Sequence, residues 1–525
     1  MTERMRIILS ALATAVLIGL TASARAQEVS IPDPGLNAAI RQGLQKPSGP
    51  LTEQDLLSLT TLDANRRNVS SLEGLEAARN LVQLDLQINQ LTDFSLPSEL
   101  TKLVSLNVSI NPLTNFFLPI GLTNLTRLSL ESAGLTNLTL PAGLTRLNGL
   151  DLFGNRLTGF NALSNLTSLT LLDLSFNSFT NFVLPGGLTN LTTFLMKGNP
   201  LTNIVVPGDM VALTNLQLDQ NLLSSFALPT GMTNLLKLNL FFNQLTNLSL
   251  PSDLRGLTEL NLNFNRFTKF SLPTNLTSLS ALHLRANLLT NFDLPAELSA
   301  LTFLDLSTNQ LTHVTLPAGH PKLSTLALSR NKFTTFILPP GLTNLTALTL
   351  AGNLLTNVVF PADLGHLVLL DLSGNLLTSF TVPAGLTNLF GLFLTGNQLT
   401  TITLPPDLIH FGELGYLGNP LTTLVLPEFL AETTLADELT VIRNLGVSVF
   451  TYPLTVRLAL PRQQPIGAFR FGIIGPPGDY VVFSSTNLAN WTELGIATNK
   501  LGAINFTDVA AHLSPQKYYR ASSAP

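Results

Sequence analysis

The sequence predicts a solenoid of stacked 22-residue coils, with short parallel strands on one wall, a helical cap and a small C-terminal β-domain. Two observations support this fold class. A marker asparagine in the pattern x-L-x-L-x-x-N returns every 22 residues from Asn89 to Asn419, except that Ala133 takes one position, and a weaker copy precedes it at Arg67. The 17 units so defined contain no insertion or deletion. Because one extra residue would disrupt a stack of coils, such strict spacing is typical of a solenoid.

The first half of each unit predicts a strand and a turn. The L-x-L stretch before the marker alternates apolar and polar residues, which indicates a short strand with its leucines pointing inward. The turn that follows leaves backbone amides and carbonyls without partners inside the coil. A buried asparagine has two donors and one acceptor, enough to bridge its own turn and the next one. We therefore interpret the marker asparagines as structural.

The second half of each unit predicts an apolar column and an extended return. Apolar residues follow the marker at positions 2, 5, 7, 11, 14 and 17. The fifth position predicts a stacked phenylalanine spine, because it is Phe in nine of the sixteen units from Asn89 on: Phe94, Phe116, Phe160, Phe182, Phe226, Phe270, Phe292, Phe336 and Phe380. Proline, as at Pro185, fixes φ and lacks a donor, so it favours an extended outer segment over a long helix.

The repeat resembles the leucine-rich repeat family in its 22-residue bacterial form, similar to the internalins. The resemblance covers roughly residues 59–430. It implies a leucine-rich repeat solenoid with a parallel β-sheet on the concave wall, an extended, turn-rich convex wall, and use as a binding scaffold. The proline-containing, Phe-rich outer half departs from the internalin unit. Ala133 and the stretch FNALSNL from Phe160, which lacks the usual proline, are interpreted as local irregularities.

Residues 1–26 predict export. Arg4 and Arg6 precede an apolar run of about fourteen residues, and Ala24 and Ala26 fit a cleavage site before Gln27, as in a secretory signal peptide. The alternative, an uncleaved membrane anchor, would require about 20 apolar residues. We therefore expect a secreted or cell-surface protein, with no membrane insertion after signal cleavage.

Both ends of the solenoid need a cover, since the last coils would expose the apolar column. In residues 27–58, the apolar residues Leu36, Ala39, Ile40 and Leu44 share one helical face, and Thr52 with Asp55 comes close to a capping box. These residues predict a cap of two short helices. At the other end, the predicted cap of residues 431–452 includes a helix from about Glu428 to Asn444, stopped by Gly446, and an apolar strand.

Residues 453–525 predict a separate small β-sandwich-like domain. Runs such as TVRLAL, AFRFGII, DYVVFSS, WTELGI and AINFTD are separated by Gly, Pro and Asn turns, which indicates about six strands. The stretch GDYVVFSSTNLANWTELG and the closing YYRA are similar to C-terminal β-modules of secreted proteins from environmental bacteria. Trp491, the single Trp, is interpreted as part of the core, with a ligand platform as the alternative.

Motifs for chemistry are absent from the sequence. With no Cys, the chain has neither a catalytic thiol nor a Cys-zinc site, and no phosphate-binding, zinc-protease or hydrolase motif occurs. Aspartates recur four residues before the marker, as at Asp151 and Asp173, where we interpret them as outward-facing polar residues. The repeated N-L-T and N-L-S tripeptides, as at Asn124, are interpreted as consensus letters, not glycosylation sites. We expect no enzyme activity, no cofactor and no metal.

The exposed strand positions indicate a binding surface. Net charge is −4 and only 11% of residues are charged, so there is no basic field for nucleic acid. Aromatic, amide and charged residues gather in the middle units, a composition typical of a recognition patch: Lys237, Asn239, Phe241, Glu259, Asn261, Asn263, His283 and Arg285. The alternative is drift in a repeat rich in Phe and Asn, with Phe242 and Phe264 folded into the turn.

Two function classes follow from this surface. The favoured one is a non-catalytic scaffold that binds a protein ligand through its concave face, with a polysaccharide or cell-wall ligand as the alternative. The other is a non-catalytic targeting module of an enzyme system, whose catalytic domain would lie on another chain.

Overall fold

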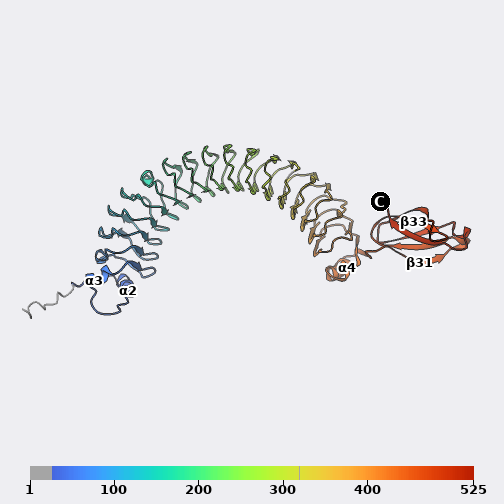
Figure 1. Ribbon diagram of the computed structural model, residues 1–525, viewed down its shortest axis with the longest axis horizontal. Helices are drawn as coiled ribbons and strands as arrows, with labels where there is room; N and C mark the ends of the chain where they lie inside the picture. The colour runs from blue at the N-terminus through green and yellow to red at the C-terminus, as the bar shows by residue number, and fades with distance from the viewer. Residues whose placement is uncertain (1–26, 319, 525) are drawn as a thin grey trace, which may run out of the picture. The chain divides into compact units, whose positions relative to one another are not determined.

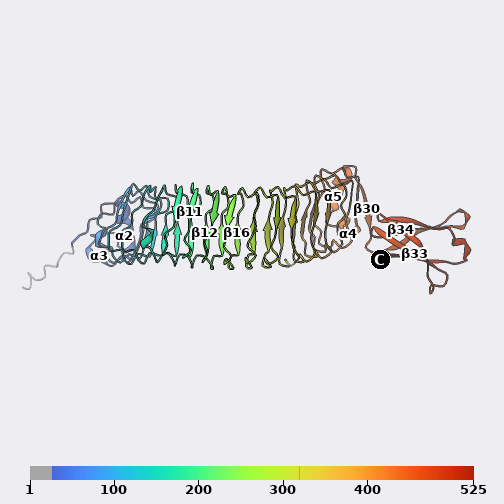
Figure 2. The same cartoon turned by 90° about the horizontal axis from the view of Figure 1, so that it is seen from above.

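The computed structural model describes residues 27–318 and 320–524, so the predicted signal peptide lies outside the described residues. The chain divides into two compact units, Met1–Asn243 and Gln244–Pro525. Both contain stacked coils, seen edge-on in Figure 1 and from above in Figure 2. Each unit is a segment of a leucine-rich repeat solenoid, as the repeat predicts, and is described by itself.

In the first unit, a parallel sheet lines the concave wall. Leu84 of one strand is the register partner of Leu106 in the next, so equivalent repeat positions align. The middle residue of each strand is buried and its two neighbours are more exposed. The strands are β1 (Thr61–Asp63), β2 (Gln83–Asp85), β4 (Ser105–Asn107), β6 (Arg127–Ser129), β7 (Gly149–Asp151), β8 (Leu171–Asp173), β10 (Thr193–Leu195), β12 (Asn215–Gln217) and β14 (Lys237–Asn239).

The second unit repeats this arrangement. Leu260 pairs with Leu282 and Leu370 pairs with Leu392, again in register and parallel. The strands are β16 (Glu259–Asn261), β17 (Ala281–His283), β19 (Phe303–Asp305), β21 (Thr325–Ala327), β23 (Ala347–Thr349), β25 (Leu369–Asp371), β26 (Gly391–Phe393) and β28 (Glu413–Gly415).

The outer half of the coils is extended, and it also forms short parallel strands that the sequence did not predict. In the first unit β3 pairs with β5 and β9 with β11; in the second unit β18 pairs with β20, β22 with β24, and β27 with β29. These strands are β3 (Asp93–Ser95), β5 (Asn115–Phe117), β9 (Asn181–Val183), β11 (Asn203–Val205), β13 (Ser225–Ala227), β15 (Asn247–Ser249), β18 (Asn291–Asp293), β20 (His313–Thr315), β22 (Thr335–Ile337), β24 (Asn357–Val359), β27 (Thr401–Thr403) and β29 (Thr423–Pro427). Two short 3₁₀ turns, η1 (Leu75–Ala77) and η2 (Ala162–Asn165), interrupt the pattern; η2 lies in the irregular stretch FNALSNL.

The marker asparagines form the predicted internal ladder. Asn177 donates through Nδ2 to the carbonyl of Leu174 in its own coil at 3.1 Å and to that of Leu152 in the preceding coil at 2.9 Å. Its Oδ1 accepts from the amide of Leu157, also in the preceding coil, at 2.9 Å. The prediction is confirmed, except that each bridge reaches back to the preceding coil and not forward. Where Ala133 replaces asparagine, its backbone carbonyl accepts from the Leu113 amide at 3.0 Å.

The predicted phenylalanine spine is confirmed only in part. Phe94 and Phe116 of consecutive coils stack with ring centroids 5.1 Å apart. Where the second position after the marker is also Phe, the ring packs within its own coil: Phe182 lies edge-on to Phe179 at 5.4 Å. Leu, Ile or Val takes the fifth position in other coils, so the aromatic column is not continuous.

A second ladder of asparagines lies on the outside of the coils and explains the N-L-T tripeptides that begin at Asn124 and Asn190. Asn124 donates through Nδ2 to the carbonyl of Thr101 in the preceding coil, and Asn190 does the same to Thr167, both at 3.1 Å. Since the same repeat position makes the same bond, these tripeptides are structural parts of the repeat.

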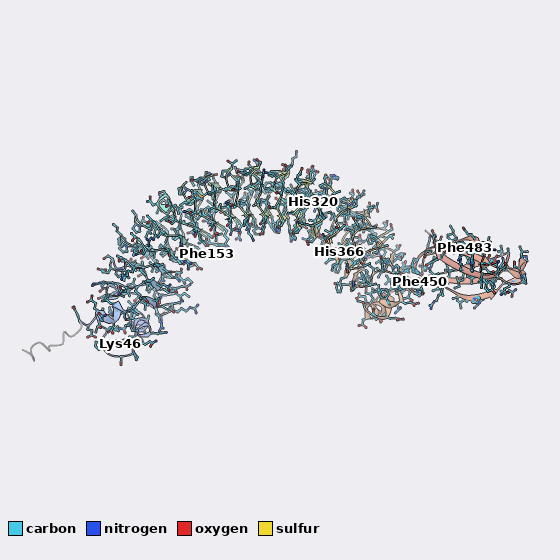
Figure 3. The ribbon with its side chains drawn as sticks, in the orientation of Figure 1. Lys46, Phe153, His320, His366, Phe450 and Phe483 are labelled. Carbon is cyan, nitrogen blue, oxygen red and sulfur yellow. The ribbon has the colours of Figure 1, made fainter. Side chains whose placement is uncertain are left out.

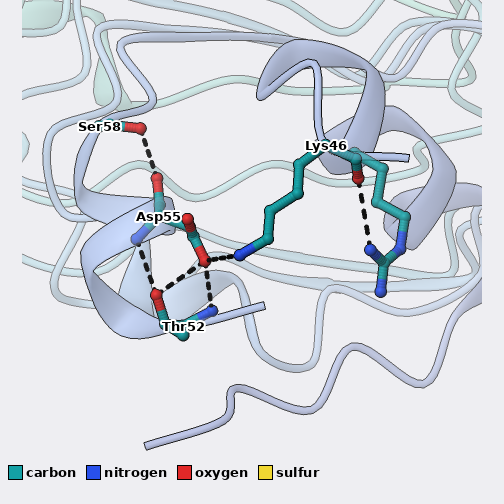
Figure 4. Close-up of polar contacts among 5 residues, drawn as sticks. Lys46, Thr52, Asp55 and Ser58 are labelled. Carbon is teal, nitrogen blue, oxygen red and sulfur yellow. Dashed lines mark hydrogen bonds and ion pairs between the residues drawn. The ribbon is translucent and has the colours of Figure 1, made fainter. Parts of the chain in front are cut away.

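The N-terminal cap consists of the two predicted helices, α2 (Pro34–Gly43) and α3 (Glu53–Leu57). Thr52 and Asp55 form a complete capping box, and Lys46 binds the Asp55 carboxylate at 2.7 Å (Figure 4). Asp33 caps α2 by accepting from the Leu36 amide, and its other oxygen accepts from Ser70. Asp33 therefore ties the cap to the first coils.

The C-terminal cap differs from the prediction in one respect. The single helix predicted from Glu428 to Asn444 is two helices, α4 (Glu428–Glu432) and α5 (Ala436–Asn444). The chain leaves helical geometry at Thr433, whose ψ is −96° and whose hydroxyl bonds back to the Phe429 carbonyl at 2.6 Å. The predicted strand is β30 (Ser448–Tyr452), which extends the outer strand pair by bonding to β29. The hydroxyl of the buried Tyr452 donates to the Leu404 carbonyl at 2.6 Å.

The C-terminal β-domain has the six predicted strands, arranged as two three-stranded antiparallel sheets. These are β31 (Arg457–Gln463), β32 (Phe469–Ile474) and β35 (Ala503–Asp508), and β34 (Thr492–Asn499), β33 (Gly478–Ser485) and β36 (Tyr518–Ser523); two short 3₁₀ turns, η3 (Pro465–Gly467) and η4 (Ala511–Leu513), connect them. Phe471, Ile473, Tyr480 and Val482 form a core shared by both sheets.

Trp491 does not belong to this core, so that prediction is wrong. It is half-buried, and the Arg520 guanidinium lies 4.5 Å from the centre of its ring. The same guanidinium lies 4.9 Å from the centre of the Phe483 ring, and Phe483 is labelled in Figure 3. Its indole therefore packs against a charged side chain outside the core.

Candidate functional site on the concave wall

The aspartates that recur four residues before the marker are structural. Asp151 accepts from the amide of Phe153 at 3.0 Å, and Asp173 accepts from that of Ser175 at 2.8 Å. Asn239 and Asn261 make the same bond at 3.1 Å in their own coils. Where this repeat position holds Asp or Asn, as in these four coils, one side-chain oxygen closes the turn after the strand.

The residue directly before the marker adopts a left-handed conformation. Phe176, Phe242 and Phe264 have φ values of 53°, 54° and 56°. In this geometry their rings are 39%, 56% and 41% exposed. The alternative that Phe242 and Phe264 fold into the turn is therefore wrong, because both residues are partly exposed at the surface.

Three predicted site residues lie in the first unit. Lys237 and Asn239 lie on β14, and Phe241 follows the strand. Lys237 is exposed and the other two are half-buried. Asn239 donates to the Gln217 side chain at 2.8 Å, and the Phe241 ring packs on Phe242 at 6.0 Å.

The other five predicted residues lie in the second unit. Glu259 and Asn261 lie on β16, and His283 on β17 is the register partner of Asn261. Asn263 accepts from the backbone amide of Arg285 at 2.6 Å, so that part of its polarity is used internally. Burial lowers the pKa of His283, while the carboxylates of Glu259 and Asp305 act in the opposite direction. The His283 ring packs against Phe303 at 4.9 Å.

A hollow that sequence reasoning missed lies in the first unit. It has a volume of about 550 Å³ and lies over Gly149, between Arg127 and Leu171 on the neighbouring strands. These three residues share the repeat position six before the marker, where most units carry a side chain. The sequence signal that could have revealed the hollow is Gly149 itself, because a glycine at a repeat position that otherwise carries a side chain leaves a gap in the concave wall.

One acidic residue lines this hollow, and two aromatic rings follow the strands beside it. Asp151 and Ser129 line it, and the Ser129 hydroxyl lies 3.5 Å from the Asp151 carboxylate. Burial, and secondly the charge of neighbouring Asp173, raise the pKa of Asp151. On the same strand end, the ring of Phe153 packs on Phe176 with centroids 5.0 Å apart (Figure 3). The ammonium group of Lys197 lies 6.0 Å from the centre of the Phe176 ring.

The histidines have structural surroundings. His320 is buried and its Nδ1 lies 3.2 Å from the Leu298 carbonyl. His366 takes the outer-ladder position of asparagine, with Nδ1 2.9 Å from the Thr343 carbonyl (Figure 3). Over residues 27–318 and 320–524, no three acidic or histidine side chains come together as a metal site. In the same ranges, no helix has the length and apolar character needed to cross a bilayer.

Part of the repeat array matches a known repeat family. Residues 174–261 and 262–368 match the BspA type leucine rich repeat region. No curated protein matches the chain.

Solved structures similar to this chain come from several sources. YopM from Yersinia enterocolitica is 25% identical over 77% of this chain and 90% of its own, with a TM-score of 0.53. The plant peptide hormone receptor RGFR1, solved in complex with RGF2, is 26% identical over 72% of this chain and 69% of its own, with a TM-score of 0.50. An internalin (inlF) from Listeria monocytogenes is 26% identical over 75% of this chain and 98% of its own, with a TM-score of 0.42.

Proposed function

We propose that this leucine-rich repeat protein is a non-catalytic scaffold, secreted or surface-associated, that binds a protein ligand through the concave strands. The main observation in favour is the distribution of constant and variable positions. The marker asparagines and the outer asparagines bond to the preceding coil and so stack the coils. Variation falls on the exposed strand residues, which hold charged, aromatic, amide and small side chains in different coils. A scaffold with a constant frame and a variable wall is suited to recognition.

The choice of a protein ligand rests on two further points. RGFR1, which has the same fold, was solved in complex with RGF2. The exposed mixture of Phe, Lys, Arg and amide side chains is also the composition typical of protein interfaces. Within this proposal, each unit contributes residues to recognition: Lys237, Asn239 and Phe241 in the first unit, and Glu259, Asn261, Asn263, His283 and Arg285 in the second.

The domain boundaries and the location belong to the same proposal. Residues 1–26 direct export and are removed, residues 27–58 and 431–452 cap the repeats of 59–430, and residues 453–525 form an accessory β-domain of sandwich type. We expect no membrane insertion, no nucleic-acid binding and no cofactor.

Charge reversal on the concave wall tests this function. The mature chain would be immobilised and exposed to proteins from the surroundings of the producing organism, with cross-linking and mass spectrometry to identify a partner. We expect Lys237→Glu with Arg285→Glu to reduce capture of that partner at least about tenfold, and Lys322→Glu, the same change in an exposed residue outside the strands, to have little effect. Equal capture by all three proteins would contradict the proposal.

The alternative to a protein ligand is a polysaccharide ligand, and a glycan array distinguishes the two. Binding to a glycan array that is lost in Phe241→Ala, without any protein partner, would assign the concave wall to a sugar. Turnover by the purified chain would instead contradict the non-catalytic assignment.

A further inference from the structure

The hollow over Gly149 is an open gap in the concave wall. A Cβ atom placed on Gly149 would have one neighbour within 4 Å, the Arg127 Cγ at 3.7 Å. The backbone there is an ordinary strand, because Gly149 pairs with Arg127 on one side and Leu171 on the other. The missing side chain therefore reflects neither strain nor crowding.

A comparable gap elsewhere in the chain is filled by the chain itself. Gly391 and Gly415 also lie on concave strands, and a Cβ on either would collide with the ring of Phe393, at 3.0 Å and 2.9 Å. One phenylalanine thus covers both glycines in the second unit. The hollow over Gly149 is the same kind of gap without a side chain to fill it, and its volume of about 550 Å³ leaves room for a long side chain from another molecule.

The chemistry of the hollow differs between its two ends. Asp151 lies on the same strand as Gly149, and Asp173 is its register partner on the next strand. Each uses Oδ1 to accept a backbone amide. Oδ2 of Asp151 also accepts from the Ser129 hydroxyl at 3.5 Å and keeps a further lone pair for another donor. Among the residues that the structure describes, neither carboxylate is in an ion pair. The opposite rim holds the exposed Arg127, and the exposed Leu171 supplies an apolar wall.

We propose that the hollow over Gly149 receives a lysine or arginine side chain of the protein ligand, an inference that rests on the proposed function. The methylene stem packs on Leu171 and the Gly149 backbone, and the cationic head binds Oδ2 of Asp151, which lines the hollow, and Oδ2 of Asp173 on the next strand. Like-charge repulsion from Arg127 directs the head toward the aspartates. The ligand cation would also separate two neighbouring carboxylates that lack a counter-charge.

A pair of short peptides tests the chemistry. The probe is acetyl-Gly-Gly-Arg-Gly-Gly-amide, and its control has citrulline in place of Arg, which keeps the shape and removes the charge. Binding to the full mature chain would be measured by saturation-transfer NMR on the peptide methylene signals. We expect the arginine peptide to bind about tenfold more tightly than the citrulline peptide, as charge-assisted hydrogen bonds predict.

Matched variants locate the site. Gly149→Leu should abolish binding by filling the gap, whereas Ala347→Leu, the same side chain at the same repeat position in another coil, should not. Asp151→Asn with Asp173→Asn should weaken binding of the arginine peptide about tenfold. It should leave the fold unchanged, because Asn239 and Asn261 make the same turn bond. Circular dichroism checks that each variant is folded.

Four results would overturn the inference: equal binding of the two peptides, no binding of the arginine peptide, undiminished peptide binding to folded Gly149→Leu, or undiminished capture of the protein partner by that variant. These experiments distinguish failure of the inference about the hollow from failure of the proposed scaffold function. If Gly149→Leu still captures the protein partner, the scaffold function stands and the hollow is not its contact. If the hollow binds the arginine peptide but no protein partner exists, the scaffold function fails alone.

Discussion

At the scale of single residues, the marker asparagine is the main source of specificity in the stack. Its side chain satisfies carbonyls in two coils and one amide in the preceding coil. Such groups are buried away from water, so an unpaired one costs about 1–3 kcal/mol. The short Asn side chain carries both donors and an acceptor, which explains why asparagine recurs at this position in almost every unit.

We expect Asn177→Ala to reduce the free energy of unfolding by at least about 3 kcal/mol, because several buried backbone groups lose their partner together. Asn181→Ala is the matched control in the same coil, since the Asn181 side chain is exposed and bonds only weakly to Thr180 at 3.4 Å. This control should change stability by less than about 0.5 kcal/mol. Urea denaturation followed by circular dichroism provides the measurement, and equal losses would contradict this account of the ladder.

The role of residues that recur from unit to unit could be predicted from the sequence. The role of a residue that matters because it lacks a side chain, such as Gly149, could not. The marker asparagines recur, so their period exposes their role. Gly149 becomes significant only beside the side chains of Arg127 and Leu171, 22 residues away on either side. Trp491 was misassigned because size and hydrophobicity favour a core position, while its actual partner, Arg520, lies in another strand.

At the scale of elements, the caps show how local signals and tertiary contacts combine. The capping box of α3 was readable from Thr52 and Asp55, and it fixes the start of a five-residue helix. The contact with Lys46 depends on the fold of the intervening loop and was not predicted. The break between α4 and α5 was also missed, because residues 428–444 contain no proline or glycine to mark it.

The N-terminal cap should loosen in acid. The Lys46 hydrogen bond, followed by that from Thr52, lowers the pKa of Asp55 to about 2. A lowered carboxyl pKa means that the folded cap binds protons less readily than the unfolded one, so its contribution is complete above about pH 4 and is lost as pH falls toward 2. Hydrogen exchange of residues 50–60, corrected for intrinsic rates, should show this loss.

The Asp55→Asn variant serves as the reference for this acid effect. It should open more readily at neutral pH and show a smaller further change between about pH 5 and pH 2. Asp33, whose pKa is also lowered because bonds from Ser70 and Leu36 outweigh its burial, remains in both proteins and cancels in the comparison. The same acid response in both proteins would exclude Asp55 as its source.

At the scale of the whole molecule, the stack consists of interchangeable coils whose contacts are mainly with their neighbours. Equivalent leucines pair in register, such as Leu326 with Leu348 and Leu348 with Leu370. Removal of one complete 22-residue unit would therefore bring together two coils whose facing surfaces are complementary, because every coil presents equivalent residues to its neighbours.

Deletion of residues 347–368, one full unit, should give a folded protein that unfolds within a few degrees of the parent, because β21 then meets β25 in register. Deletion of residues 347–367, one residue less, should be strongly destabilising, since a one-residue slip turns the inward leucines outward. Thermal unfolding by circular dichroism and size-exclusion chromatography would compare the two. Similar behaviour of both deletions would mean that the period is not a packing constraint.

The outer asparagine ladder has a practical consequence for production of the protein. Asn124 and Asn190 begin the tripeptide that eukaryotic secretory pathways modify with N-linked sugars, yet their amide nitrogens bond to the preceding coil. An oligosaccharide on either nitrogen would place bulk in the seam between two coils. A host without this modification system therefore keeps the bonds of this seam and is the suitable source of material for binding studies.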